Sequence, residues 1–254
     1  MLKRVVLLVV LAMLLAPLAA RGQEKEPASV FIYATYFVCD VTGQDLVDEV
    51  AKTVYAPVYN AAVDDGTILS WGWMAHHVGG KWRRLLYRSA PSIDAVLAGA
   101  DKIGEKIDEN TPAAAGQVGR ICNSHDDYIW RQVAGSAGEK GVQQRGKVGF
   151  STYLVCDMAK EERADQLMRE VIAPIFSRYV TEGKLTSWGW MEHIVGGQYR
   201  RLEVITAKDY PTLMQARGAM IEELVKNHKE AATEFDSICN SHQDYLWDIQ
   251  QEKP

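Results

Sequence analysis

The residues best suited to chemistry gather in one short stretch that occurs twice. SWGWMAHHVGGKWRRL at residues 70–85 recurs as SWGWMEHIVGGQYRRL at residues 187–202. Side chains alternate along a strand, so a glycine, a methionine and a histidine share one face and two tryptophans share the other. The candidate ligand-binding residues of the first face are Met74, His76, Met191 and His193.

The orientation of that face decides what it can do. If it lines an interior, the imidazoles can bind a haem, act as a base, or stand beside an apolar ligand in a methionine-lined cavity. The alternative, which we favour slightly, is a packed interior in which each histidine is hydrogen-bonded to a neighbouring strand. The sequence does not show which face points inward.

An arginine pair ends each hairpin, and it adds two candidates, Arg84 and Arg201. Adjacent strand residues face opposite sides, so one arginine of each pair can point inward. Such an arginine can clamp a ligand carboxylate or pair with Asp40 or Asp157. A structural ion pair is the favoured interpretation.

A third string, ICNSHDDYIW at residues 121–130, recurs as ICNSHQDYLW at residues 238–247. A consecutive block of fixed residues does not fit two-residue alternation, so its first half is predicted to be a loop. The histidines and aspartates can form acid–base pairs, or the polar side chains can hold the loop by hydrogen bonds to its backbone. The candidates here are His125, Asp127, His242 and Asp244.

Other function classes find no support. The chain has no HExxH, CxxC or EF-hand pattern, so no metal site is predicted. It also has no P-loop and no GxGxxG pattern, so no nucleotide site is predicted. A net charge of -5 gives no electrostatic reason to expect nucleic-acid binding. With 47% hydrophobic and 24% charged residues, the composition argues against disorder and a multi-span membrane protein.

The first 22 residues have the layout of a secretory signal peptide. Lys3 and Arg4 precede an apolar run from residue 5 to residue 15, and small residues follow, with cleavage predicted before Gln23. The alternative is an uncleaved anchor, but the run is too short to span a bilayer comfortably. We therefore expect an exported protein, periplasmic or extracellular, with no stable membrane span after cleavage.

The strings at residues 70–85 and 121–130 both recur 117 residues later. So does a third string, TYFVCD at residues 35–40, which recurs as TYLVCD at 152–157. Such long matches in one order indicate a duplication. The predicted organisation is a signal peptide, two repeats and a Gly-rich linker between them. The boundaries are 1–22 for the signal peptide, 30–133 for the first repeat, 134–147 for the linker and 148–250 for the second repeat.

Each repeat predicts the element order β-α-β-β-α-β. In the first repeat the strands are 31–41, 69–78, 81–88 and 127–133, and the helices are 45–63 and 92–107. The second repeat matches them, and Pro57 and Pro174 predict a kink in the first helix of each. This order gives a ferredoxin-like unit, a four-stranded antiparallel sheet with two helices on one face.

A hairpin of the form GW...GG..RR followed by a helix, within such a unit, resembles the dimeric α+β barrel superfamily. The resemblance implies that the two α+β units pair sheet against sheet as a fused, pseudo-twofold barrel. It also implies cofactor-independent monooxygenases, haem-handling proteins and small isomerases as precedents. Fold alone does not transfer these activities.

The four cysteines form two matched sets, and an exported chain meets an oxidising compartment. Three connectivities are possible, and four free thiols are the alternative. In a ferredoxin-like sheet the first and last strands are antiparallel neighbours, so the end of one lies near the start of the other. This favours Cys39–Cys122 and Cys156–Cys239.

Two classes of function remain open. The first is an exported protein that binds a small apolar or aromatic ligand in the barrel, or that serves as a scaffold. The second is a monooxygenase-like or haem-handling enzyme. All candidate residues are intact in both repeats, which fits two equal sites or a shared structural need. The repeats pair within the chain, and further oligomerisation stays open.

Overall fold

The computed structural model describes residues 30–137 and 145–254. The predicted signal peptide and most of the predicted linker therefore lie outside the described residues. The strands are β1 Phe31–Val38, β2 Ser70–Val78, β3 Arg84–Ala90, β4 Ser124–Ala137, β5 Val148–Val155, β6 Ser187–Val195, β7 Arg201–Ala207 and β8 Ser241–Lys253. The α-helices are α1 Gln44–Val50, α2 Ala56–Asp64, α3 Ile93–Asn110, α4 Pro112–Ile121, α5 Glu161–Leu167, α6 Ala173–Thr181, α7 Tyr210–Asn227 and α8 Lys229–Ile238.

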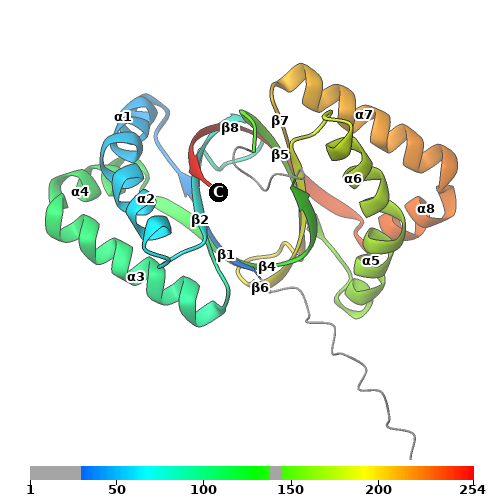
Figure 1. The fold of residues 1–254 in the computed structure, drawn as a ribbon, viewed down its shortest axis with the longest axis horizontal. Helices are drawn as coiled ribbons and strands as arrows, with labels where there is room; N and C mark the ends of the chain where they lie inside the picture. The colour runs from blue at the N-terminus through cyan, green and yellow to red at the C-terminus, as the bar shows by residue number, and fades with distance from the viewer. Residues whose placement is uncertain (1–29, 138–144) are drawn as a thin grey trace, which may run out of the picture.

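The strands close into one barrel in the order β1-β3-β2-β8-β5-β7-β6-β4. Helices α1–α4 cover one side of this barrel and α5–α8 the other (Figure 1). The mixed α+β composition and the closed barrel confirm the broad fold prediction. All strand pairs are antiparallel.

The last strand of each half joins the two halves. The first part of β4 pairs with β1 and its second part with β6, with a register shift between Gln132 and Ala134. In the same way β8 pairs first with β5 and then with β2. Both strands are longer than predicted, and residues 134–137 of the predicted linker belong to β4.

Two local predictions are wrong. The segment around His125 is not a loop, because β4 begins at Ser124, where it pairs with Val38 of β1. A second helix before the last strand was also not predicted in either half; these helices are α4 and α8. Their apolar faces are short, with Val118 the one buried residue of α4, so periodicity gives little signal.

The predicted kinks take the form of π-helical turns. Residues Ala51–Tyr55 and Met168–Ile172 are π-helical, and each turn lies directly before the helix that carries Pro57 or Pro174. A proline cannot donate the hydrogen bond of a regular helix, so a wider turn before it accommodates the missing donor.

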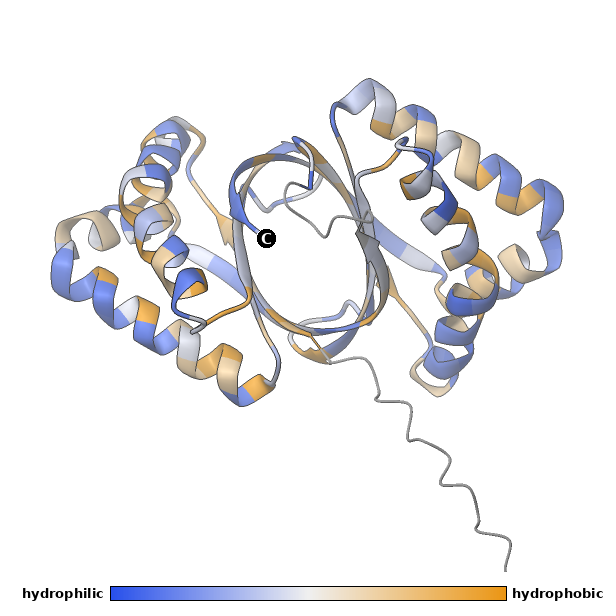
Figure 2. Ribbon diagram, in the orientation of Figure 1, coloured by the Kyte–Doolittle hydropathy of each residue, from blue (hydrophilic) through white to orange (hydrophobic). Residues whose placement is uncertain are grey.

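The barrel wall separates an inner core from two outer cores. Each outer core lies between the helices and the outer face of the strands, and the inner core is rich in aromatic residues. Along the helices of Figure 2 hydrophilic and hydrophobic residues alternate, as expected of helices that cover a sheet.

Both disulfides have the predicted pairing. Cys39 is bonded to Cys122, and Cys156 to Cys239, each across 83 residues. Each bond joins the end of a first strand to the start of a last strand. Among the described residues no cysteine is free.

Candidate functional site

The hairpin strands β2 and β6 turn their glycine and methionine face inward. Trp71 and Trp73 point outward, where their indole N–H groups donate to Asn60 Oδ1 and Asp48 Oδ1, each at 2.8 Å. Met74 and Met191 line a cavity inside the barrel. The structure therefore shows which face of each hairpin points into the barrel.

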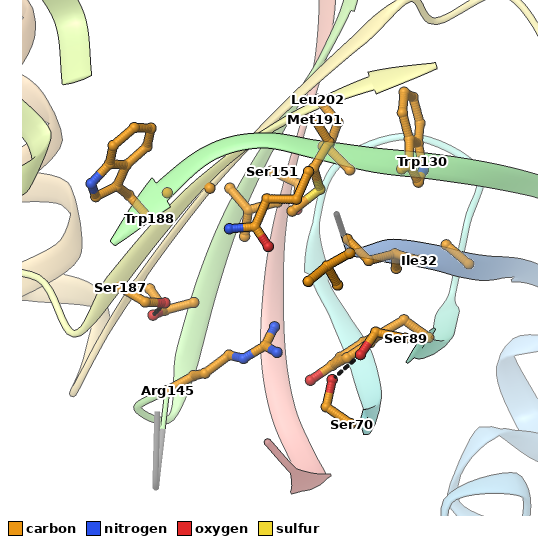
Figure 3. Close-up of a pocket in the computed structure, with 18 of the residues that line it drawn as sticks. Ile32, Ser70, Ser89, Trp130, Arg145, Ser151, Ser187, Trp188, Met191 and Leu202 are labelled. Carbon is orange, nitrogen blue, oxygen red and sulfur yellow. Dashed lines mark hydrogen bonds between the residues drawn. The ribbon is translucent and has the colours of Figure 1, made fainter. Parts of the chain in front are cut away.

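The cavity has a volume of about 480 Å³, within the usual range for small-molecule sites. It occupies the end of the barrel where β1 and β5 begin and β4 and β8 end (Figure 3). Its apolar lining comes from several strands: Ile32, Ala34, Met74, Leu85, Trp130, Met191, Leu202 and Val204.

An aromatic cluster fills the other end of the barrel and forms the floor of the cavity. Rings stack in sequence across it, with 4.2 Å between the centroids of Tyr36 and Trp82 and 5.0 Å between those of Trp82 and Tyr245. The members of this cluster are Tyr36, Trp82, Tyr128, Trp130, Tyr153, Tyr199, Tyr245 and Trp247. The interior is thus packed at one end and hollow at the other, and the hollow end contains Met74 and Met191 but neither His76 nor His193.

The cavity is not symmetric between the halves. Tyr87 of β3 and Val204 of β7 are equivalent positions, and both line it. A Cβ atom on Gly72 would collide with the ring of Tyr87, whereas one on Gly189 would meet only the methyl group of Met191, at 3.1 Å. The tyrosine therefore fills, on the first half's side, the space that stays open beside Val204.

Two further differences between the halves also place a larger side chain on the first half's side of the barrel. Glu252 of β8 pairs across from Gly72, and its equivalent Gly135 pairs across from Gly189. Ile32 lines the cavity where the second half has Gly149. The two halves thus contribute unequal side chains to one cavity that residues of both halves line.

Polar groups meet at the mouth. The guanidinium carbon of Arg145 lies 4.9 Å from the centre of the Tyr87 ring. Glu252 Oε1 accepts a hydrogen bond from the backbone N–H of Arg145 at 2.9 Å. Burial raises the pKa of Glu252 above its usual range, and it raises the pKa of Tyr87 to about 12 although Arg145 opposes that rise.

Hydroxyl pairs flank this mouth on both halves. The hydroxyls of Ser70 and Ser89 are hydrogen-bonded at 2.6 Å, as are those of Ser187 and Thr206. Deeper inside, the hydroxyl of Tyr153 is buried and has no hydrogen-bond partner, like the hydroxyl of Tyr87. The cavity is therefore apolar in its body and offers hydrogen bonds at a few fixed points.

The predicted histidines lie beyond the aromatic floor. Arg83 Nη1 donates to His76 Nδ1 at 2.9 Å, and Arg200 Nη1 donates to His193 Nδ1 at 2.8 Å. Burial and then the neighbouring arginine lower the pKa of both imidazoles. Neither histidine lines the cavity.

Arg84 and Arg201 point outward into buried ion pairs. Arg84 donates to Asp48 through Nε and Nη2, at 2.5 and 2.6 Å. Arg201 donates to Asp165 at 2.8 and 2.7 Å. The structural ion pair is therefore observed, but its acids come from α1 and α5 rather than from Asp40 and Asp157.

The remaining candidates lie outside the cavity as well. His125 Nε2 is 3.3 Å from Asp127 Oδ2, and His242 Nδ1 is 3.1 Å from Asp244 Oδ1. Each pair lies at the start of its strand, with the imidazole about half exposed. The structure brings each histidine and aspartate together, and neither pair lines the barrel cavity.

The residues of the cavity do not fit histidine-ligated haem. Among the described residues that line it there is no histidine and no cysteine. His76 and His193, the predicted axial ligands, are separated from it by the floor and accept hydrogen bonds from arginines. A haem would have to displace the aromatic cluster to reach either imidazole.

The sequence did not identify Tyr87, Arg145, Val204 or Glu252 as site residues. Attention to residues fixed in both repeats led away from them, because Tyr87 and Val204 differ between the repeats, Arg145 lies in the predicted linker and Glu252 lies beyond the predicted second repeat. The one usable signal was the exchange of Tyr87 for Val204 inside an otherwise matched hairpin.

Comparison with known proteins supports the fold alone. No protein-family model matches the chain, and no curated protein matches its sequence. Among solved structures, the "putative monooxygenase" of Lactobacillus acidophilus NCFM has a TM-score of 0.61 at 10% identity, over 89% of this chain and 96% of that one. A "putative monooxygenase" of Fusobacterium nucleatum reaches 0.63 at 8% identity, over 90% and 95%.

An anthrone oxidase-like protein is also similar, with a TM-score of 0.55 at 11% identity over 90% of this chain and 94% of that one. These similar structures are dimeric α+β barrel proteins, as the resemblance in the sequence implied. At such identities the likeness establishes the fold and leaves the activity open.

Proposed function

We propose that this chain, which has the dimeric α+β barrel fold, is an exported binding protein for one small apolar or aromatic molecule. The ligand occupies the barrel cavity on the side of the second half. The observation that carries the proposal is an apolar cavity of about 480 Å³ closed on one side by a continuous aromatic floor. A scaffold would have no need of such a space.

The buried hydroxyls support a ligand over an empty interior. Tyr87 is 5% exposed and Tyr153 is 0% exposed, yet neither hydroxyl has a partner among the described residues. Buried polar groups are normally hydrogen-bonded, and an unmade bond costs about 1–3 kcal/mol. A ligand with polar atoms at the right places would supply the missing partners.

The proposal also covers the internal symmetry of the barrel. Each half is a ferredoxin-like unit, residues 30–133 and 148–250, and the two arose by duplication. The strand orders β4-β1-β3-β2 and β8-β5-β7-β6 support this, since they match each other and the ferredoxin-like order. Divergence after duplication then left one site per chain.

Export is part of the proposal, with residues 1–22 as the signal peptide. Two disulfides are typical of oxidising compartments. No helix in the ranges that the structure describes has the length and apolarity to cross a membrane. Expression with and without residues 1–22, followed by cell fractionation, tests this part.

The binding test uses a neutral aromatic probe, 2-naphthalenemethanol. We expect saturable fluorescence changes with the wild type and none with Val204→Tyr, which gives the second half the side chain of the first. The matched control, Val225→Tyr, changes an exposed valine on α7, 52% exposed, and should bind normally. No saturable binding by the wild type would overturn the proposal.

Oxygenation of the bound ligand is a second candidate, drawn from the names of the similar structures. The observation that favours it is Glu252, a partly buried carboxyl near Tyr87, beside the cavity, whose raised pKa suits a proton acceptor. Ligand-dependent oxygen consumption that is lost in Glu252→Gln would support an enzyme. Ligand binding without oxygen consumption would contradict the enzyme and support the binding protein.

A further inference from the structure

The polar groups of the mouth narrow the class of ligand, on the premise that the proposed cavity binds one. We infer that the ligand is an amphipathic carboxylic acid. Its carboxylate binds the guanidinium of Arg145 and the hydroxyl of Tyr87. Its apolar body extends from there toward Met191, Leu202 and Val204.

Arg145 provides a positive charge with no counter-charge in place. Its side chain is half-buried and reaches into the cavity (Figure 3). No carboxylate lies within 4.0 Å of its guanidinium in residues 30–137 and 145–254, whereas Arg84 and Arg201 are paired with Asp48 and Asp165. A partly desolvated cation gains most from an anionic partner that shares its environment.

Tyr87 provides a second donor at the same place. Arg145 lies over its ring, and its hydroxyl is buried without a partner. Because burial raises the pKa of Tyr87 to about 12, the hydroxyl keeps its proton at neutral pH and can donate. A guanidinium and a phenol together present donors only, which is the complement of a carboxylate.

Among the described residues, Glu252 is the acidic side chain that faces these groups, and its geometry leaves the guanidinium available. Its Oε1 accepts from the backbone N–H of Arg145, and its Oε2 has no partner. It does not line the cavity. Burial raises the pKa of Glu252 above its usual range.

The rest of the lining suits an apolar body. Met191, Leu202 and Val204 form the open side, and the ring of Tyr153 closes the bottom. Gly189 lines the cavity and carries no side chain, and a Cβ atom there would meet only the methyl group of Met191, at 3.1 Å. Charge at the mouth and apolar surface below it together define an amphipathic acid.

The test compares 2-naphthoate with 2-naphthalenemethanol, which share a ring system and differ in charge. We expect the wild type to bind the carboxylate at least about tenfold more tightly than the alcohol. Arg145→Met should remove that preference and leave the affinity for the alcohol within about twofold. The control Arg169→Met removes an equal charge from an exposed site on the outer helices and should keep the preference.

The outcomes separate this inference from the proposed function. Equal affinities in the wild type, or a preference that survives Arg145→Met, would overturn the inference that the ligand carries a carboxylate bound by Arg145. Neither result would contradict the proposed binding function. Loss of the preference in Arg169→Met as well would show a general effect of net charge and overturn the role of Arg145. Failure of both probes to bind would overturn the proposed function together with this inference.

Discussion

Tyr87 and Val204 occupy equivalent positions in the two halves of one barrel, and the ring of the first fills the space that stays open beside the second. Both line the same cavity, opposite Gly72 and Gly189 respectively. Residues that are identical in the two halves, such as Met74 and Met191, line the cavity together with this pair, which differs between the halves.

Replacing Tyr87 by valine should lower the stability of the protein and enlarge the cavity. Tyr87→Val removes a buried ring that lies between Gly72 and Arg145. We expect a loss of about 2–4 kcal/mol in the free energy of unfolding, typical of large-to-small core substitutions. Urea denaturation measures this, and the enlarged cavity should accept probes larger than a naphthalene. An unchanged midpoint would mean that the ring does not pack as the structure shows.

The buried ion pairs should matter more for stability than exposed ones. Asp165 accepts from Trp190 Nε1 at 2.7 Å and from Arg201, and the side chains of Asp165 and Arg201 are 9% and 3% exposed. Asp165→Asn removes the carboxylate that accepts from Nε and Nη2 of Arg201 and leaves Glu161, 3.1 Å from Nη1, as the remaining counter-charge. We expect a cost of about 3 kcal/mol in the free energy of unfolding. Chemical denaturation measures the loss.

The matched controls for this prediction lie on the same chain. Asp48→Asn breaks the equivalent pair of the first half and should cost at least as much, because Arg84 has the neutral Gln44 where Arg201 has Glu161. Glu182→Gln breaks exposed pairs with Arg178 and Lys184 and should cost less than about 1 kcal/mol. Equal losses for Asp165→Asn and Glu182→Gln would contradict a buried structural role.

Glu203 should make stability depend on pH. It lies on β7 across from Trp190, toward α7, and burial raises its pKa to about 7 although Arg217 opposes that rise. Its pKa in the unfolded chain is near 4.5. Between these values the folded state holds a proton that the unfolded state has released, so stability falls as the pH rises from about 4.5 to about 7.

The first half has Leu86 at the equivalent position, which makes Glu203→Leu the natural variant. Its stability relative to the wild type should increase across the same pH window, by on the order of 1–2 kcal/mol at pH 8. Thermal unfolding at pH 5 and pH 8 measures the difference. Parallel pH curves for the two proteins would show that Glu203 is not desolvated in the folded state.

The sequence predicts the fold well where a local pattern and a global arrangement agree. Alternation placed Trp73 and Met74 on opposite faces, and both disulfides followed from the adjacency of first and last strands. Helix α4 was missed because it buries only Val118. The joining of halves through β4 and β8 depends on long-range pairing, which one repeat considered alone does not contain.

The site was harder to predict, because conserved chemistry between repeats proved to be structural. The fixed residues Arg84 and His76 pair with Asp48 and Arg83 away from the cavity. Even some differences between halves compensate one another: Trp82 donates to Asp126 in one half, and Tyr199 donates to Gln243 at the same place in the other. Only uncompensated exchanges, such as Tyr87 for Val204, change the shape of the interior.

The most direct test of a single, asymmetric site is the binding stoichiometry by isothermal titration calorimetry with 2-naphthalenemethanol. The account predicts one molecule bound per chain by the wild type and none by Val204→Tyr, with both proteins folded. Two molecules per chain, or unchanged binding by Val204→Tyr, would contradict it.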